Sequence, residues 1–186
     1  MKPEQRIEDQ VIANLEWLGY KGAPWIRRAK LGREGFGFVD LLLLPTDGPH
    51  RVVLVEVKHE KAPDTPGRFI GQALAYYLAA LRLGSDGLNR LRTFANDPRA
   101  HDATGKSVQE LSGIGRGQKP KDVEALRAGN RVRPDEVALL VVLGREDGKD
   151  EQRESLRDLR DWLKTRGNLD IRVFIAREDG SLQPCK

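Results

Sequence analysis

Hydrophobic and polar positions along this chain alternate in blocks whose lengths suit strands and helices. Short apolar runs bounded by turn residues predict strands, whereas longer segments with apolar positions three and four residues apart predict helices. The predicted strands are 25–30, 36–44, 51–58, 136–143 and 171–175. The predicted helices are 4–18, 66–83 and 150–166. Periodicity alone therefore indicates a mixed α/β fold.

Two of these strands carry charged residues where a buried strand is normally apolar. The turn-rich segment 45–49 separates 36–44 from 51–58, so we expect the two strands to pair as a hairpin. Asp40 lies near the front of the first apolar run, and Glu56 lies near the end of the second. A hairpin of this kind can bring the two carboxylates side by side.

The end of the second strand combines an acid and a base on one face. Side chains two apart on a strand share a face, so Glu56 and Lys58 point the same way while Val57 points into the core. Glu-x-Lys alone is common in a chain with 32% charged residues, so the upstream Asp40 gives the pattern its meaning. Two carboxylates and the Val57 carbonyl form a hard-oxygen site suited to Mg²⁺ or Mn²⁺. Beside it, Lys58 can orient or deprotonate a water, which is the chemistry of phosphodiester hydrolysis.

The order of these residues resembles the PD-(D/E)XK nuclease superfamily, which includes the archaeal Holliday-junction resolvases, many restriction endonucleases and RecB-type nuclease domains. Segment 7–20 is similar to the family's first helix, and segment 68–77 to the helix that carries a Gln and a Tyr four residues apart in RecB-like members. The resemblance covers residues 1–83. It implies a restriction endonuclease-like core, αβββαβ, with a central mixed sheet flanked by helices. One departure is Val39, which precedes Asp40 where the motif's name has Pro.

The resemblance also implies a role for each matching residue. The first helix would direct Glu8 at the metal site, and Gln72 and Tyr76 would lie one turn apart on one helical face. Two alternatives stay open. Glu8 can be a first-turn acid that complements the helix dipole, with Asp9 as a competing choice, and Tyr76 can belong to the apolar core. The implied catalytic residues are Asp40, Glu56, Lys58, Gln72 and Glu8, and the implied metal ligands are Asp40, Glu56, the carbonyl of Val57, and Glu8.

Positive charge is concentrated in segment 84–133. It holds ten Lys or Arg residues against six acids, a difference equal to the chain's whole formal net charge of +4. Lys and Arg release counterions from phosphates, so this Gly-rich insertion is well placed to clamp a polyanion. Within it, 108–117 resembles the hairpin of a helix-hairpin-helix, although an ordinary surface loop also explains the segment. The residues predicted to bind nucleic acid are Arg28, Lys30, Arg68, Tyr76, Arg116, Lys119 and Lys121.

The remaining composition is consistent with one domain, 1–186, in which 84–133 is an insertion or clamp. A chain of 186 residues with 39% hydrophobic residues can bury one sizeable core. The lone Cys185 cannot form an internal disulfide. The opening residues lack the apolar stretch of a signal peptide, so we expect a cytoplasmic protein that does not enter a membrane.

These features together predict a Mg²⁺-dependent nuclease, with Mn²⁺ able to substitute and with nucleic acid, expected to be DNA, as substrate. The leading alternative is a nucleic-acid-binding module that keeps the fold without cleavage. The intact Asp40, Glu56 and Lys58 argue against it. A third interpretation is a metal-dependent enzyme for a small phosphorylated substrate, but no Gly-rich phosphate loop supports it. A homodimer is left open.

Overall fold

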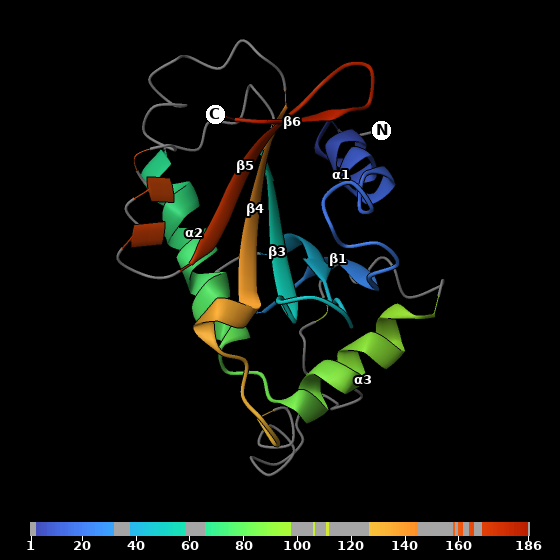
Figure 1. The fold of residues 1–186 in the computed structure, drawn as a ribbon, viewed down its shortest axis with the longest axis vertical. Helices are drawn as coiled ribbons and strands as arrows, with labels where there is room; N and C mark the ends of the chain where they lie inside the picture. The colour runs from blue at the N-terminus through green and yellow to red at the C-terminus, as the bar shows by residue number, and fades with distance from the viewer. Residues whose placement is uncertain are drawn as a thin grey trace.

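The computed structural model describes a mixed α/β arrangement built on a six-stranded sheet (Figure 1). The described residues are 3–31, 38–58, 66–97, 106, 111, 127–144, 158, 160–161, 164–165 and 169–185. Their helices are α1 (Pro3–Ala13), α2 (Pro66–Ala80), α3 (Ser85–Ala95) and the short 3₁₀ helix η2 (Pro134–Glu136). Their strands are β1 (Trp25–Ala29), β2 (Val39–Leu43), β3 (Val52–Lys58), β4 (Val137–Gly144), β5 (Asp170–Ala176) and β6 (Leu182–Pro184).

The sheet follows chain order, β1-β2-β3-β4-β5-β6, and mixes two kinds of pairing. The first three strands are antiparallel, β3, β4 and β5 are parallel, and β6 returns antiparallel to β5. All five predicted strands form, and the predicted hairpin is confirmed by the pairing of Leu41 with Val55 and of Leu43 with Val53. The short strand β6 was not expected from the sequence, because three residues give no readable alternation.

Both faces of the sheet are buried, each in its own hydrophobic core. Val53 and Val55 of β3 belong to the core on the α1 side, whereas Val52 and Leu54 belong to the core on the α2 side. Figure 1 shows α1 and α2 on opposite sides of the strands. This double coverage explains why the central strands are apolar along almost their whole length.

Helix α1 is shorter than the predicted segment 4–18, because it ends at Ala13. Asn14 stops the regular helix: its side-chain amide donates to the carbonyl of Gln10 over 2.8 Å and to that of Gly180 over 3.0 Å. The chain then continues in turns to Gly19, whose φ of 87° is a left-handed conformation that favours glycine. The contact with Gly180 also ties α1 to the turn between β5 and β6.

Segment 84–133 contains a helix that the sequence pattern did not predict. Helix α3 buries Leu88 and Leu91 in the core on the α2 side, and each such side chain stabilises the fold by about 2 kcal/mol. The guanidinium of Arg92 donates to the carbonyls of Leu44 (3.2 Å) and Pro45 (2.5 Å). Arg92 therefore holds the turn between β2 and β3 in place and is a structural residue of this segment.

The two ends of the same segment are tied together. The amide of Ser85 donates to the carbonyl of Asn130 over 3.0 Å, and Gly84 bridges to Arg131. A side chain at Gly84 has no room, because its Cβ would fall 2.0 Å from the carbonyl oxygen of Ala128. The two ends of the segment thus lie side by side.

A buried polar cluster lies at the end of the sheet where the parallel strands begin. The Tyr20 hydroxyl is 3.1 Å from Nδ1 of His50, and Nε2 of His50 is 3.2 Å from the carboxylate of Asp170. Asp170 also accepts hydrogen bonds from Arg172. Burial, opposed by the Asp170 charge and aided by Arg172, lowers the pKa of His50. The cluster joins the loops before β1 and β3 to β5.

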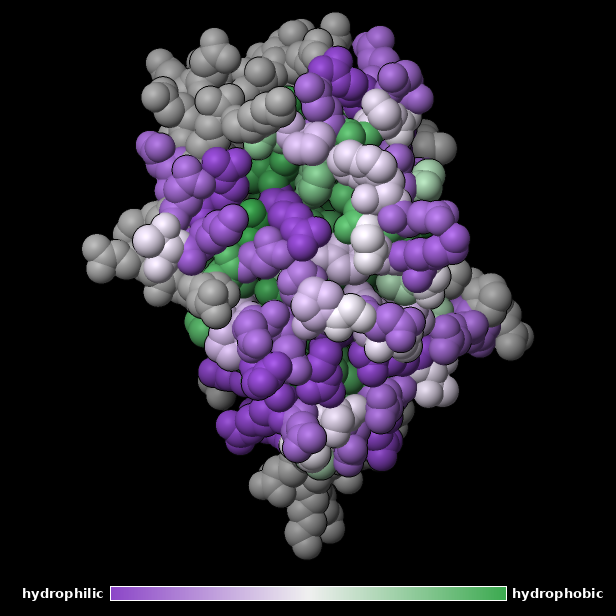
Figure 2. Space-filling model, in the orientation of Figure 1, coloured by the Kyte–Doolittle hydropathy of each residue, from purple (hydrophilic) through white to green (hydrophobic). Residues whose placement is uncertain are grey.

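Some predicted features lie outside the described residues. They include Arg116, Lys119, Lys121, nearly all of the hairpin-like segment 108–117, and much of the predicted helix 150–166. Leu111 is described, and it is buried in the core on the α2 side. Among the helices that are described, none is both long and apolar enough to cross a bilayer. The face seen in Figure 1 is mainly hydrophilic, with hydrophobic residues showing mostly in its upper half (Figure 2).

Candidate active site

Asp40 is fixed against the end of β3 by a main-chain hydrogen bond. The backbone N–H of Val57 donates to Oδ2 of Asp40 over 2.7 Å. The pairing of β2 with β3 ends at Leu41 and Val55, and beyond it the Asp40 side chain, not its main chain, contacts β3. The Asp40 carboxylate therefore lies against the main chain between Glu56 and Lys58.

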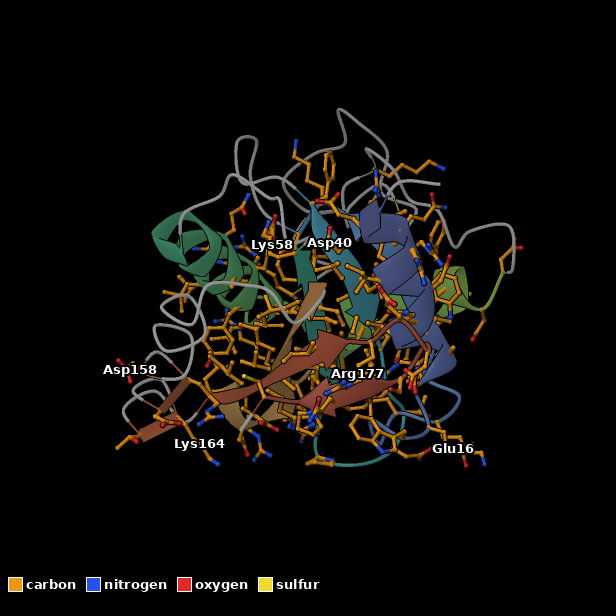
Figure 3. The ribbon with its side chains drawn as sticks, turned by 90° about the horizontal axis from the view of Figure 1, so that it is seen from above. Glu16, Asp40, Lys58, Asp158, Lys164 and Arg177 are labelled. Carbon is orange, nitrogen blue, oxygen red and sulfur yellow. The ribbon has the colours of Figure 1, made fainter. Side chains whose placement is uncertain are left out.

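Glu56 and Lys58 point to one face and form an ion pair. Nζ of Lys58 lies 3.1 Å from Oε1 of Glu56, and the two side chains are 18% and 4% exposed. Val57 between them is buried on the other face, as expected for successive residues of a strand. Figure 3 shows Asp40 and Lys58 close together between α1 and α2. An acid, a second acid and an ammonium thus meet at the carboxyl end of β3.

Helix α2 lies beneath the carboxylates with Gln72 and Tyr76. Tyr76 is 1% exposed and belongs to the hydrophobic core, so its ring packs under the site and is not open to a substrate. Its pKa is raised by burial and by the nearby charges of Glu56 and Asp40. Oε1 of Gln72 is buried and, within the described part of the chain, receives no hydrogen bond. The side chain of Arg68, on the same helix, lies outside the described residues.

Glu8 reaches the same region from α1, where it is held by two arginines. Its carboxylate is 1% exposed, with Oε2 3.1 Å from Arg27 and Oε1 3.7 Å from Arg28. Burial raises the pKa of Glu8, and the charges of Arg27 and Arg28 oppose that rise. Arg27 also forms an ion pair with Asp9. The first-helix acid therefore faces the site, but its closest partners are arginines.

The backbone of β1 turns at Arg28, which has a φ of 54°. This left-handed conformation is strained for a residue with a Cβ, and it interrupts the alternation of β1. The expectation that Arg28 and Lys30 share one strand face rested on that alternation, whereas Arg27 and Arg28 both reach Glu8. Arg27 was not predicted as a site residue, because regular alternation would have placed it on the face opposite Arg28.

The electrostatics of the site favour a proton or a cation at Asp40. Burial raises the pKa of Asp40 to about 7, and Glu8 adds to the rise. The Val57 hydrogen bond and the Lys58 charge act in the opposite direction. A cation beside this buried carboxylate would offset its negative charge, and so it would favour the ionised form that burial disfavours.

The donor set suits a hard divalent cation. Mg²⁺ in proteins is typically held by one or two carboxylates, and waters and substrate phosphates complete its shell. Asp40, Glu56 and the Val57 carbonyl supply such a set. Across the described ranges, no group of three or more His, Cys, Asp or Glu side chains is placed to hold a metal. Any ion here would therefore be held by the carboxylates of Asp40 and Glu56, and the other ligands would be the Val57 carbonyl, waters or phosphate oxygens.

Comparison with known proteins adds no further assignment, since no family model, no curated protein and no solved structure matches this chain.

Proposed function

We propose that this protein is a Mg²⁺-dependent nuclease with a restriction endonuclease-like core. The observation that carries the proposal is the meeting of Asp40, Glu56 and Lys58 at one strand end, through the Val57 hydrogen bond of 2.7 Å and the Lys58 ion pair of 3.1 Å. The order α1, three antiparallel strands, α2 and a strand parallel to β3 supports the fold part of the proposal. These residues are also the ones on which the family resemblance rests.

Asp40, Glu56 and the Val57 carbonyl would hold the metal, with Mn²⁺ as a substitute for Mg²⁺. Such an ion supplies Lewis-acid polarisation of the phosphate and acidifies water. In hydrolysis, a water oxygen attacks phosphorus, the bond to the leaving oxygen breaks, and that oxygen takes up a proton. Lys58 is the side chain placed to orient the water or to stabilise the developing negative charge.

The surrounding residues would bind and position the substrate. The Arg28 side chain is 29% exposed, and its guanidinium lies 3.7 Å from Oε1 of Glu8, which is a long ion pair. Arg28 can therefore turn toward a phosphate while Arg27, at 3.1 Å, keeps Glu8 in place. Gln72, whose side-chain oxygen is buried, would anchor Lys58 or a backbone phosphate. Nucleic acid, with DNA expected, is the substrate class that these cations and the basic segment 84–133 support.

A substrate panel tests the proposal. Wild-type protein should cleave at least one of single-stranded, duplex and branched DNA, or RNA, in Mg²⁺ or Mn²⁺, and chelation should stop the reaction. Lys58→Ala, purified in the same way, controls for a contaminating nuclease. Binding without cleavage across the whole panel would contradict the proposal and favour the alternative, a silent nucleic-acid-binding module.

A further inference from the structure

Phe38 is an exposed aromatic ring beside the candidate site. Its exposed fraction is 41%, and the described part of the chain contains only two other large hydrophobic residues with comparable exposure, Trp17 and Leu78. Trp17 packs edge-on against Phe174 with ring centroids 5.8 Å apart. Phe38 belongs to neither hydrophobic core of the described residues.

The position of Phe38 follows from the alternation at the start of β2. Phe38 is exposed, Val39 is fully buried and Asp40 is half-buried, so Phe38 and Asp40 turn to the side opposite Val39. Two residues of extended chain separate their Cα atoms by about 7 Å. Val39 packs in the core on the α2 side, so Phe38 and Asp40 turn toward the side of α1, where Arg28 meets Glu8. The ring therefore stands near the Asp40 carboxylate.

The neighbourhood of the ring limits what it can bind. Lys58 and Arg28 are cations suited to a phosphate, and a flat apolar ring near Asp40 offers a surface for a nucleobase. Stacking on an aromatic side chain needs no particular base, since every base has a π-face.

We propose that Phe38 is a stacking platform for an unpaired base next to the bound phosphate, so that the site takes single-stranded or locally unpaired nucleic acid. A base inside a duplex would first have to leave its stack, and that cost is comparable with the gain from one aromatic contact. Paired substrates should therefore bind less well. This inference rests on the proposed function for its ligand class, but it concerns binding and does not require cleavage.

The test compares a short oligothymidylate of about 12 nucleotides with an oligomer of the same length built from abasic units, in Ca²⁺. Both carry the same phosphates, so their affinity ratio isolates the bases. Wild type should prefer the oligothymidylate by roughly 5- to 100-fold, and Phe38→Leu should lose most of that preference while its affinity for the abasic oligomer stays unchanged. Phe38→Tyr, which keeps the ring, and Trp17→Ala should both behave as wild type.

The outcomes separate this inference from the proposed function. The stacking role would be overturned if Phe38→Leu kept the wild-type preference for the oligothymidylate, or if wild type showed no such preference. Either result would count even if the protein cleaves nucleic acid. A preference that depends on Phe38 in a protein that cleaves nothing would support the stacking role and would count against the nuclease. Because Phe38 is exposed, thermal unfolding of Phe38→Leu should match wild type, which shows that lost affinity reflects the missing ring.

Discussion

The backbone N–H of Val57 donates to Oδ2 of Asp40 over 2.7 Å, so the main chain between Glu56 and Lys58 itself positions the third charged residue of the site. The contact crosses from β3 to β2 and involves no side chain of Val57. Replacing Val57 by another apolar residue of similar size should therefore leave the carboxylates in place. The arrangement depends on strand register, which the buried faces on both sides of the sheet keep from slipping.

We predict that Asp40→Asn stabilises the metal-free protein at alkaline pH. Burial raises the pKa of Asp40 to about 7, above its ordinary value of 3.8. The folded protein favours protonated Asp40, so the contribution of this carboxyl to the free energy of unfolding is fully present below about pH 4. It is lost as the pH rises through 7, because the buried carboxyl must then ionise. At about pH 8 the variant should be more stable than wild type by roughly 1 to 4 kcal/mol, and near pH 4 the two should converge. Urea unfolding in a chelator measures this, and Asp47→Asn, at an exposed site, should show no such gain.

His50 should produce a pH dependence of the opposite sign. Its pKa is lowered by burial, so the folded protein favours neutral His50. The corresponding stability is present above the unfolded value of about 6.5 and is lost as the pH falls below it. His50→Gln should flatten the acid side of the stability profile. If the free energy of unfolding of His50→Gln falls as steeply toward acid pH as that of wild type, groups other than His50 cause the fall.

Glu8→Gln should destabilise the protein by roughly 2 to 4 kcal/mol, because it leaves Arg27 and Arg28 beside a neutral amide in a buried position. The matched control is Glu16→Gln, which removes an exposed ion pair with Lys21. That change should cost less than about 1 kcal/mol. Equal effects of the two substitutions in urea unfolding would contradict a structural role for the Glu8 ion pairs.

The basic residues of segment 84–133 should divide into two groups. Arg92→Ala should lower the free energy of unfolding by about 1 to 3 kcal/mol, because the carbonyls of Leu44 and Pro45 lose their donor. It should not alter the salt dependence of nucleic-acid binding. Neutralising Arg116, Lys119 and Lys121 together should instead reduce the salt slope by about 0.7 to 0.9 for each lost phosphate contact. An unchanged slope in the triple variant would exclude the segment as a clamp.

The central hairpin could be predicted from sequence because its signals are local. A turn-rich segment and two apolar runs suffice to predict that β2 pairs with β3. Helix α3 was missed because Gly87 and the charges of its exposed face dilute a short apolar stripe formed by Leu88, Leu91 and Ala95.

The arginine contacts of Glu8 could not be predicted in the same way. They depend on the left-handed backbone of Arg28, which departs from the regular alternation of a strand. They also join α1 to β1 through side chains far apart in sequence, and no local pattern encodes such a contact. The burial of Tyr76 beneath the site likewise follows from how α2 packs on the sheet.

The most direct test of the nuclease account is a Mn²⁺ titration by calorimetry, run beside a cleavage assay on wild type, Glu56→Gln and Lys58→Ala. Wild type should bind Mn²⁺ and cleave. Glu56→Gln should lose Mn²⁺ affinity together with cleavage, whereas Lys58→Ala should bind Mn²⁺ at least as tightly as wild type and cleave roughly 100-fold more slowly or not at all. Wild-type Mn²⁺ binding in Glu56→Gln, or wild-type cleavage in Lys58→Ala, would contradict the account.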